Sequence, residues 1–180
     1  GIIFSLWACV ASAEIVEFGV NESPPFWSEN KAHQGMCGAI MQALSEETGI
    51  EAKIYFKPLK RLINDVHNND IGNPELYMYQ QAFVSIIPIL SYRSAFYAYQ
   101  PKNGEKPALQ LNSLTDLAQY KVGILKGALI DKVAFEQVGV YFETSYKQSS
   151  LFKKLKVGRI DLVLEIDLAA ESIIHDLYPE

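Results

Sequence analysis

The first side chains with usable chemistry lie in one loop, directly after a short apolar stretch. Glu22, Phe26 and Trp27 supply a carboxylate and two aromatic faces, and Pro24 and Pro25 stiffen the backbone between them. An aromatic face stacks on a solute or holds a cation, and a stiff loop suits a preformed site. The loop is therefore a candidate wall of a small-molecule site. The alternative is that both aromatic side chains are core packing.

Patterns of catalysis and of metal binding are missing from the sequence. His33, His67 and His175 stand in separate contexts without metal-ligand spacing. No serine lies in a nucleophile-elbow pattern, and no glycine-rich loop is built to hold phosphate. We therefore expect no catalytic residue, no metal and no cofactor, and we interpret the protein as a binder and not an enzyme.

Residues 1–13 have the pattern of an export signal. The apolar run Ile2–Val10 is followed by small residues at 11–13, as at a signal-peptide cleavage site, and is shorter than the ~20 apolar residues of a membrane span. We interpret residues 1–13 as the remnant of a signal peptide and expect a periplasmic protein. Two alternatives stay open: an N-terminal strand or buried helix, and a lipoprotein signal at Cys9. We rank the lipoprotein signal lower because Trp7 stands where a small residue is expected.

Composition limits the partners. The chain is 49% hydrophobic and 21% charged, which predicts a folded protein long enough for one domain or two small lobes. A formal net charge of −5 argues against nucleic acid or an anionic membrane surface as the main partner, because both require basic patches. A small-molecule partner and a monomeric protein are expected.

The rest of the chain has the periodicity of two α/β units. In the first unit, strands and helices alternate, with expected bounds of 15–20, 35–48, 50–56 and 59–66. An aromatic strand over 94–99 and a loop over 100–111 precede the second unit. That unit is expected to begin with a short helix at Ser113 and to continue with elements at 121–125, 129–138, 141–144, 151–157, 160–165 and 168–177. Such alternation predicts parallel sheets with a ligand at the carboxyl ends of the strands. We assign 14–99 to the first lobe and crossover, and 100–180 to the second lobe.

Together these features resemble the extracellular solute-binding proteins of family 3, which include the periplasmic amino-acid-binding components of ABC transporters. The resemblance rests on the order of elements, the double proline and aromatic after the first strand, the segment Lys121–Gly127, and residues 158–161 before an apolar strand. It covers Glu14 to Glu180. It implies an α/β two-lobe periplasmic-binding-protein-like fold of type II, in which each lobe is a mainly parallel sheet flanked by helices. Family members continue with a segment that returns to the first lobe, so we expect this final return segment to be missing.

The resemblance also implies contacts to the ligand, and this sequence departs from two of them. Amino-acid binders of the family carry a Thr and an Arg after the third strand, where the Arg clamps the ligand carboxylate. The matching region, residues 72–81, has no Arg and offers Asn73 and Tyr77 instead. The tyrosines of this part of the chain suggest an aromatic-lined pocket or, equally, strand packing. In the second lobe Lys126 and Gly127 match, but Ala128 replaces a Thr, which leaves backbone N–H groups for an anion.

Two charged residues complete the candidate set. Arg61 follows a proline where divergent family members place an Arg, so the resemblance favours the mouth of the cleft, and a solvated helix face is the alternative. Glu165, with Asp167 as the alternative, lies near the position where family members keep an Asp for the ligand's amino group. Because two carboxylate contacts are missing, a standard α-amino acid is less favoured than the family implies.

The predicted function is therefore capture of a small polar or zwitterionic, amino-acid-like solute for the membrane permease of an ABC-type transporter. One alternative is a dehydratase-like enzyme, because relatives of this fold include dehydratases and function resides in sites. A second alternative is the ligand-sensing domain of a signalling receptor, which would use the same lobes.

Overall fold

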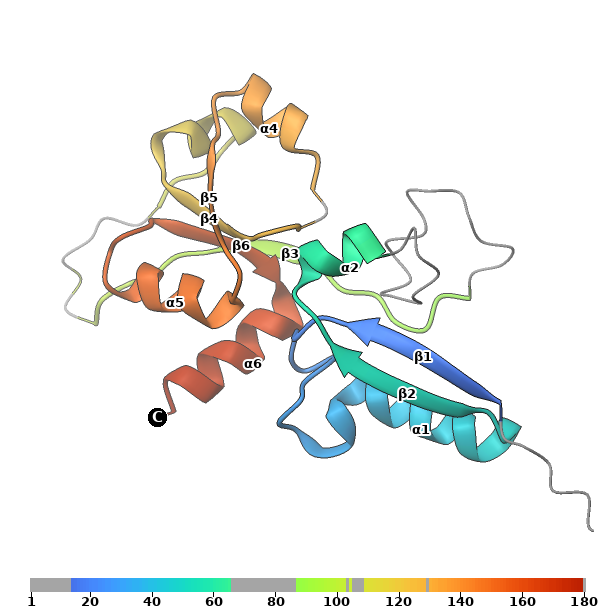
Figure 1. The fold of residues 1–180 in the computed structure, drawn as a ribbon. Coiled ribbons are helices and arrows are strands. Elements are labelled where there is room, and N and C mark those ends of the chain that lie inside the picture. The colour runs from blue at the N-terminus through green and yellow to red at the C-terminus, as the bar shows by residue number, and fades with distance from the viewer. Residues whose placement is uncertain (1–13, 66–86, 103, 105–108, 129, 180) are drawn as a thin grey trace, which may run out of the picture.

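The computed structural model describes residues 14–65 and 87–179, apart from 103, 105–108 and 129, and shows two lobes, each built on its own sheet (Figure 1). In the first lobe β1 and β2 pair in parallel, and α1 and α2 contact them. The elements of this lobe are β1 (Ile15–Val20), η1 (Ala32–Gln34), α1 (Met36–Thr48), β2 (Glu51–Phe56) and α2 (Leu59–Asp65).

The second lobe is a four-stranded sheet in the order β3-β6-β4-β5 within the described residues. β4 pairs in parallel with both β5 and β6, whereas β3 runs antiparallel to β6, so the sheet is mainly parallel, as predicted. Its elements are β3 (Ser94–Tyr97), η3 (Leu114–Gln119), β4 (Val122–Leu125), α4 (Lys132–Gln137), β5 (Phe142–Ser145), α5 (Gln148–Lys156), β6 (Leu162–Ile166) and α6 (Asp167–Leu177).

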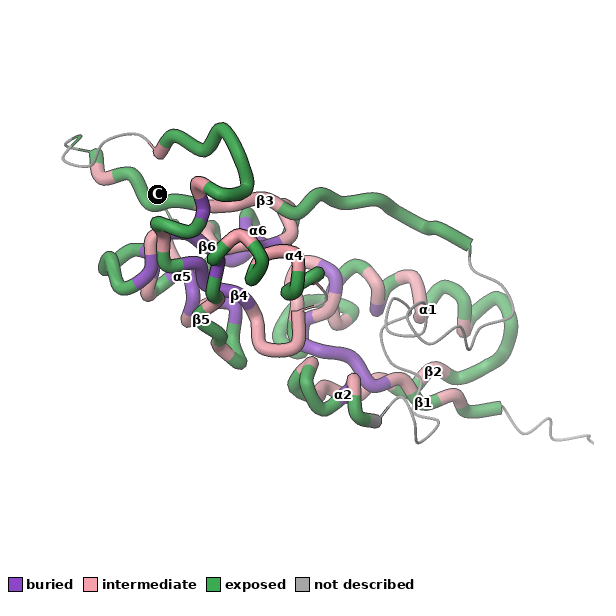
Figure 2. The backbone as a smooth tube through the Cα atoms, turned by 90° about the horizontal axis from the view of Figure 1, so that it is seen from above, coloured by how far each residue is buried: buried purple, intermediate pink, exposed green. Residues whose placement is uncertain are grey.

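The alternating side chains of β6 build the core of this lobe from both faces of the sheet. Val163 is fully buried against α5 and α6, beside Leu151 and Ile173. Leu162 points to the opposite face, where it packs with Val122 and other apolar residues. Buried residues accordingly run along this sheet and continue at the end of β1 (Figure 2).

Local hydrogen bonds explain where the predicted element bounds were wrong. The helix expected over 129–138 begins only at Lys132, because the Asp131 carboxylate accepts the Ala134 N–H and caps it there. The helix expected from Leu151 begins at Gln148. The capping box at Ser113 is confirmed, although the helix that it opens is a 3₁₀-helix.

The division between lobes stays a prediction. β3 lies in the segment that we assigned to the first lobe and crossover, yet it pairs with β6 of the second lobe. The proposed signal remnant, residues 1–13, lies outside the described residues, as does the region of Asn73 and Tyr77. Across the described ranges, every helix is too short or too polar to span a bilayer.

The two lobes touch directly where Gly127 follows β4. Gly127 has a φ of +95°, and a Cβ placed on it would lie 3.3 Å from both the Lys60 nitrogen and Ile63 Cδ1 of α2. A second contact joins the lobes through Lys31 and Asp176, whose Nζ and Oδ2 atoms are 3.1 Å apart. That ion pair is exposed and contributes little, so the close backbone approach at Gly127 is the main constraint.

This contact makes Gly127 a test of how the lobes are held. Gly127→Ala places a methyl group against α2 on a left-handed backbone, so we expect a loss of about 1 kcal/mol or more in the free energy of unfolding. The added methyl group also requires the α2 backbone to give by a few tenths of an ångström, so the loss should exceed that of a variant that meets backbone strain alone. Gly49→Ala is the matched control, because Gly49 also has positive φ but open space around its Cβ. Thermal unfolding measures both losses, and a loss in Gly127→Ala no larger than that in Gly49→Ala would contradict the proposed role of Gly127.

Candidate ligand-binding cleft

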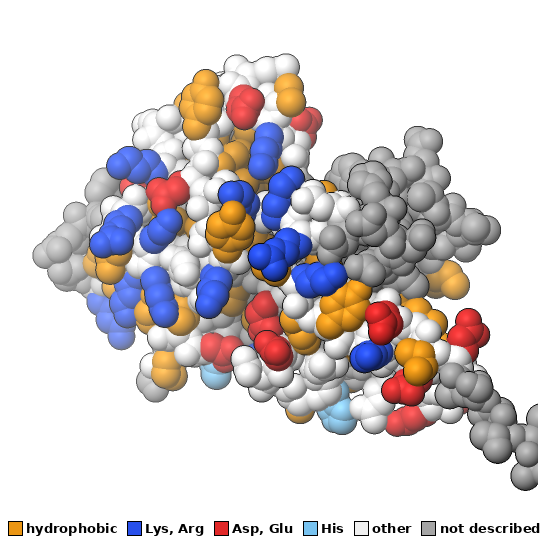
Figure 3. All heavy atoms as spheres, viewed as in Figure 1, with side chains coloured by type: hydrophobic (Ala, Val, Ile, Leu, Met, Phe, Trp, Pro, Cys, Tyr) orange, Lys and Arg blue, Asp and Glu red, His pale blue; other side chains and the backbone are white. Residues whose placement is uncertain are grey.

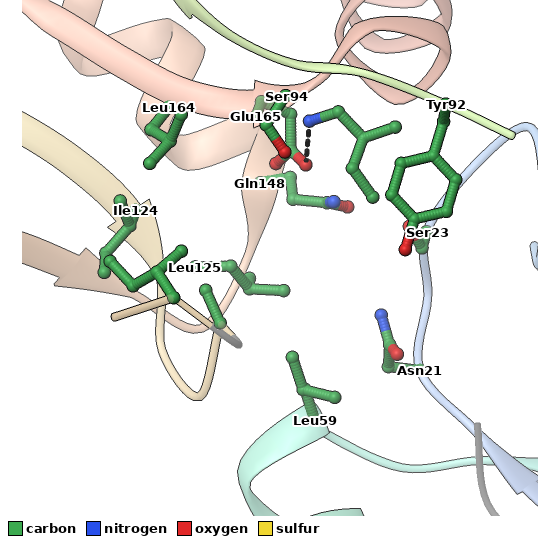
Figure 4. A pocket seen from close by; sticks show the side chains of 13 residues that line it. Asn21, Ser23, Leu59, Tyr92, Ser94, Ile124, Leu125, Gln148, Leu164 and Glu165 are labelled. Atoms are coloured by element: carbon green, nitrogen blue, oxygen red, sulfur yellow. Dashed lines mark hydrogen bonds between the residues drawn. The ribbon is translucent and has the colours of Figure 1, made fainter. Parts of the chain in front are cut away.

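A cavity of about 160 Å³ lies between the lobes, at the carboxyl ends of β1, β4 and β6 (Figure 4). Asn21, Ser23 and Leu59 face it from the first lobe, and Glu165 and Gln148 face it from the second. The remaining lining residues are mostly apolar: Tyr92, Ser94, Ile124, Leu125, Ala128, Ile130, Leu164 and Ile166. An apolar cavity with a few convergent polar groups is the usual form of a small-molecule site.

Glu165 and Gln148 meet because of the strand period and the start of α5. Glu165 lies two residues after Val163, so its side chain points to the sheet face that α5 covers. Gln148 is the first residue of α5 and reaches the same end of β6. Only 7% of each residue is exposed, and the two side chains are hydrogen-bonded.

The burial of Glu165 makes ionisation of its carboxyl group unfavourable. Burial raises the pKa of its carboxyl group above the ordinary value, although hydrogen bonds from the Ile166 N–H, at 2.9 Å from Oε1, and from Gln148 oppose the shift. No Lys, Arg or His is among the described residues that line this cavity. A cationic group of a ligand would therefore supply the missing counter-charge.

A second, wider cavity of about 540 Å³ adjoins the first and opens toward the cleft mouth. Both cavities are lined by Asn21, Leu59, Leu125 and Gln148, so Gln148 stands between two compartments of one cleft. Tyr146 and Lys147, at the start of α5, face the wider compartment, and its volume falls within the roughly 300–1,000 Å³ that ligand sites typically have.

The predicted residues of the first loop are placed unevenly. Glu22 lines the wider compartment, but its two carboxylate oxygens already accept the Ser28 hydroxyl at 2.6 Å and the Glu29 N–H at 2.9 Å. Phe26 is buried, and its ring lies 6.0 Å from that of Tyr92. Neither Phe26 nor Trp27 lines either of the two described cavities.

The predicted cations, Arg61 and Lys126, line neither of the two described cavities. Arg61 is exposed on α2 of the first lobe, and Lys126 follows β4 of the second. Lys126 Nζ donates to the Tyr146 hydroxyl at 2.8 Å and lies 4.6 Å from the centre of its ring. The N–H groups of Lys126 and Ala128 donate to the carbonyl groups of Ser145 and Leu125, so these two amides already have partners within the protein and are not left for an anion as predicted.

Sequence reasoning missed Asn21, Gln148 and Tyr146. Asn21 directly follows β1, and Tyr146 directly follows β5, so the rule that ligands bind at the carboxyl ends of strands could have identified both. Gln148 was missed because α5 was expected to begin at Leu151. No group of three metal-binding side chains occurs in the part of the chain that the structure describes.

Comparison with known proteins identifies the fold. No protein-family model and no curated protein matches the chain. Among solved structures, an ancestral arginine-binding protein bound to arginine is similar, with a TM-score of 0.69 and 21% identity over 90% of this chain and 74% of that one. The ancestral amino-acid-binding protein AncCDT-1, described as a precursor of cyclohexadienyl dehydratase, has a TM-score of 0.67 and 17% identity over 89% and 74%. The substrate-binding protein of an amino acid ABC transporter has a TM-score of 0.65 and 17% identity over 91% and 75%.

These similarities confirm the predicted fold class, the α/β two-lobe fold of periplasmic binding proteins. The identities of 17–21% concern the fold and carry no information about which molecule this chain binds.

The raised pKa of Glu165 predicts that ionisation of this carboxyl group destabilises the folded protein. Between the ordinary pKa of 4.5 and the raised value, the folded protein keeps a proton that the unfolded chain has lost. The free energy of unfolding therefore falls as pH rises through this window. Glu165→Gln cannot ionise, so we expect the ligand-free variant to be more stable than the wild type at pH 7.

Thermal unfolding between pH 4 and pH 8 measures this difference. Glu171→Gln, an exposed residue of α6, is the matched control and should follow the wild type. A stability profile of Glu165→Gln that runs parallel to that of the wild type would show that Glu165 carries no buried charge.

Proposed function

We propose that this chain is a solute-binding protein that captures a small amine-bearing, polar or zwitterionic solute between its lobes. The observation that carries the proposal is the Glu165 carboxylate, which is 7% exposed, lies in the cavity between the lobes and has no cationic side chain beside it in the described lining. An ammonium or guanidinium group that enters this cavity restores the charge balance and adds charge-assisted hydrogen bonds.

The two compartments support an amino-acid-like ligand. The inner cavity presents Glu165, Gln148 and Asn21 to a cationic, hydrogen-bonding group, while the wider compartment offers Lys147 and Tyr146 to the rest of the ligand. Because the lining comes from both lobes, a bound solute contacts both and favours the closed arrangement over an open one.

Delivery to the permease of an ABC-type transporter in the periplasm, by a monomer, completes the proposal. The similar structures support it through what their names state: two bind amino acids, and one serves an amino acid ABC transporter. The export signal that we infer at residues 1–13 is consistent with this compartment.

Differential scanning fluorimetry of the chain against amino acids, amines, short peptides and carboxylates tests the proposal. A ligand at 100 times its dissociation constant adds about 2.7 kcal/mol to the free energy of unfolding, which is a shift of several degrees in Tm. Glu165→Gln should abolish the shift, and Glu171→Gln should keep it. If no compound of these classes stabilises the wild type, the protein is not a binder of such solutes.

A dehydratase-like enzyme is the second candidate, because the raised pKa of Glu165 suits a general acid in an enclosed site. One of the similar structures is described as a precursor of a dehydratase, which agrees with this reading. Incubation of each stabilising compound with the protein, followed by mass spectrometry for loss of water, measures turnover. Turnover that disappears in Glu165→Gln would establish the enzyme, and tight reversible binding without turnover would exclude it.

A further inference from the structure

We propose that Arg61, Lys126 and Tyr146 form an anion-binding site across the mouth of the cleft, which takes a carboxylate or phosphate group and joins the two lobes. Arg61 belongs to α2 of the first lobe, while Lys126 and Tyr146 follow β4 and β5 of the second. Lys and Arg side chains gather where the two lobes meet, on the face shown in Figure 3.

Lys126 and Tyr146 form the second lobe's half of this site. Lys126 Nζ donates to the Tyr146 hydroxyl at 2.8 Å, which uses one of three ammonium protons and leaves the phenol proton without an acceptor among the described residues. Tyr146 is 63% exposed, so this O–H and the remaining ammonium protons face the cleft mouth and solvent. A carboxylate or phosphate oxygen can therefore accept from both side chains at once.

Arg61 provides the first lobe's half. It follows Lys60, whose backbone lies against Gly127, the residue after Lys126. In agreement with this placement, the hydrogen bond and charge of Lys126 lower the pKa of the Tyr146 phenol, and the charge of Arg61 lowers it further. Neither Arg61 nor Lys126 has a carboxylate partner in the described part of the chain. Of the acids nearby, Glu143 is paired with Lys154, Asp176 with Lys31, and Glu22 accepts from Ser28 and the Glu29 N–H, whereas Glu29 also lines the wider compartment.

The contact between the lobes brings these like charges together. Gly127 lies against Lys60, and each of these residues is the direct chain neighbour of one cation, Lys126 or Arg61. Closing the lobes therefore costs repulsion between Arg61 and Lys126, screened but not removed by water and salt. An anion held between Arg61 and Lys126 attracts both cations. This attraction offsets their repulsion and stabilises the closed arrangement.

The site is separate from the buried carboxylate and has two possible occupants of the same chemistry. Tyr146 and Lys147 line the wider compartment, so the carboxylate end of a solute held at Glu165 can extend toward them. A free inorganic anion can occupy the same position without any solute. The site therefore does not require the proposed solute-binding function.

Inorganic phosphate tests the site directly. Thermal unfolding is followed from 0 to about 10 mM sodium phosphate, with sodium chloride adjusted to keep the ionic strength constant. We expect Tm of the wild type to rise and saturate. Because each partner supplies an exposed charge-assisted hydrogen bond, Arg61→Gln, Lys126→Gln and Tyr146→Phe should each raise the apparent dissociation constant for phosphate about threefold or more.

The control variant is Lys132→Gln, which removes an exposed cation from α4 and should behave as the wild type. Circular dichroism verifies that all variants are folded. A wild-type Tm that does not respond to phosphate at constant ionic strength overturns the site, and so does an equal response in all the variants.

A second measurement distinguishes the two occupants. Lysine and cadaverine differ by one carboxylate, and their dissociation constants are compared in phosphate-free buffer by calorimetry. If the solute's carboxylate occupies the site, lysine binds more tightly than cadaverine to the wild type, and Lys126→Gln removes most of this difference. If lysine and cadaverine both fail to bind while phosphate still raises Tm, the site stands as one for a free anion and the proposed solute is wrong.

Discussion

A close approach of backbone to backbone joins the two lobes, and the arrangement of the cleft depends on it. Gly127 after β4 lies directly against Lys60 at the start of α2, in a space where a Cβ would be within 3.3 Å of the Lys60 nitrogen. A side chain at this position would widen the cleft. Because Gly127 has no side chain, the carboxyl ends of β1, β4 and β6 face one another across a cavity of about 160 Å³. The same approach brings Arg61 of one lobe toward Lys126 of the other.

The cleft so formed has opposite charge at its two ends. Glu165 stands at the inner end, buried and hydrogen-bonded to Gln148, and its pKa is raised because desolvation outweighs its hydrogen bonds. Arg61, Lys126 and Lys147 stand at the outer end in contact with solvent. The wider compartment also carries the carboxylates of Glu22, Glu29 and Asp176, of which Glu22 and Asp176 already have partners within the protein. An elongated solute with an amine at one end and an acidic group at the other fits both ends of the cleft, and this polarity would set its orientation.

The periodicity of apolar residues predicted the strand and helix order of both lobes because each element buries one face, and burial follows sequence period. The family resemblance, and not the periodicity, proposed Glu165 and Lys126 as ligand contacts; Glu165 lies near the carboxyl end of β6 and Lys126 directly follows β4. The periodicity did not predict Gln148, whose burial depends on how α5 packs over β6. Phe26 shows the same limit. An aromatic side chain has no sequence signal for the surface that it covers, and here it packs beside Tyr92 outside both described cavities.

The first loop shows how one lobe is prepared before a ligand arrives. Both carboxylate oxygens of Glu22 accept hydrogen bonds, one from the Ser28 hydroxyl and one from the Glu29 N–H. A pair of hydrogen bonds also joins the backbones of Ser23 and Trp27. The loop therefore keeps its shape through its own bonds, and its order adds no entropy cost to binding. The second lobe differs, because the buried Glu165 has no cationic side chain beside it in the described lining of its cavity. The first lobe therefore acts mainly as a preformed wall, to which Arg61 adds a cation for the proposed anion site.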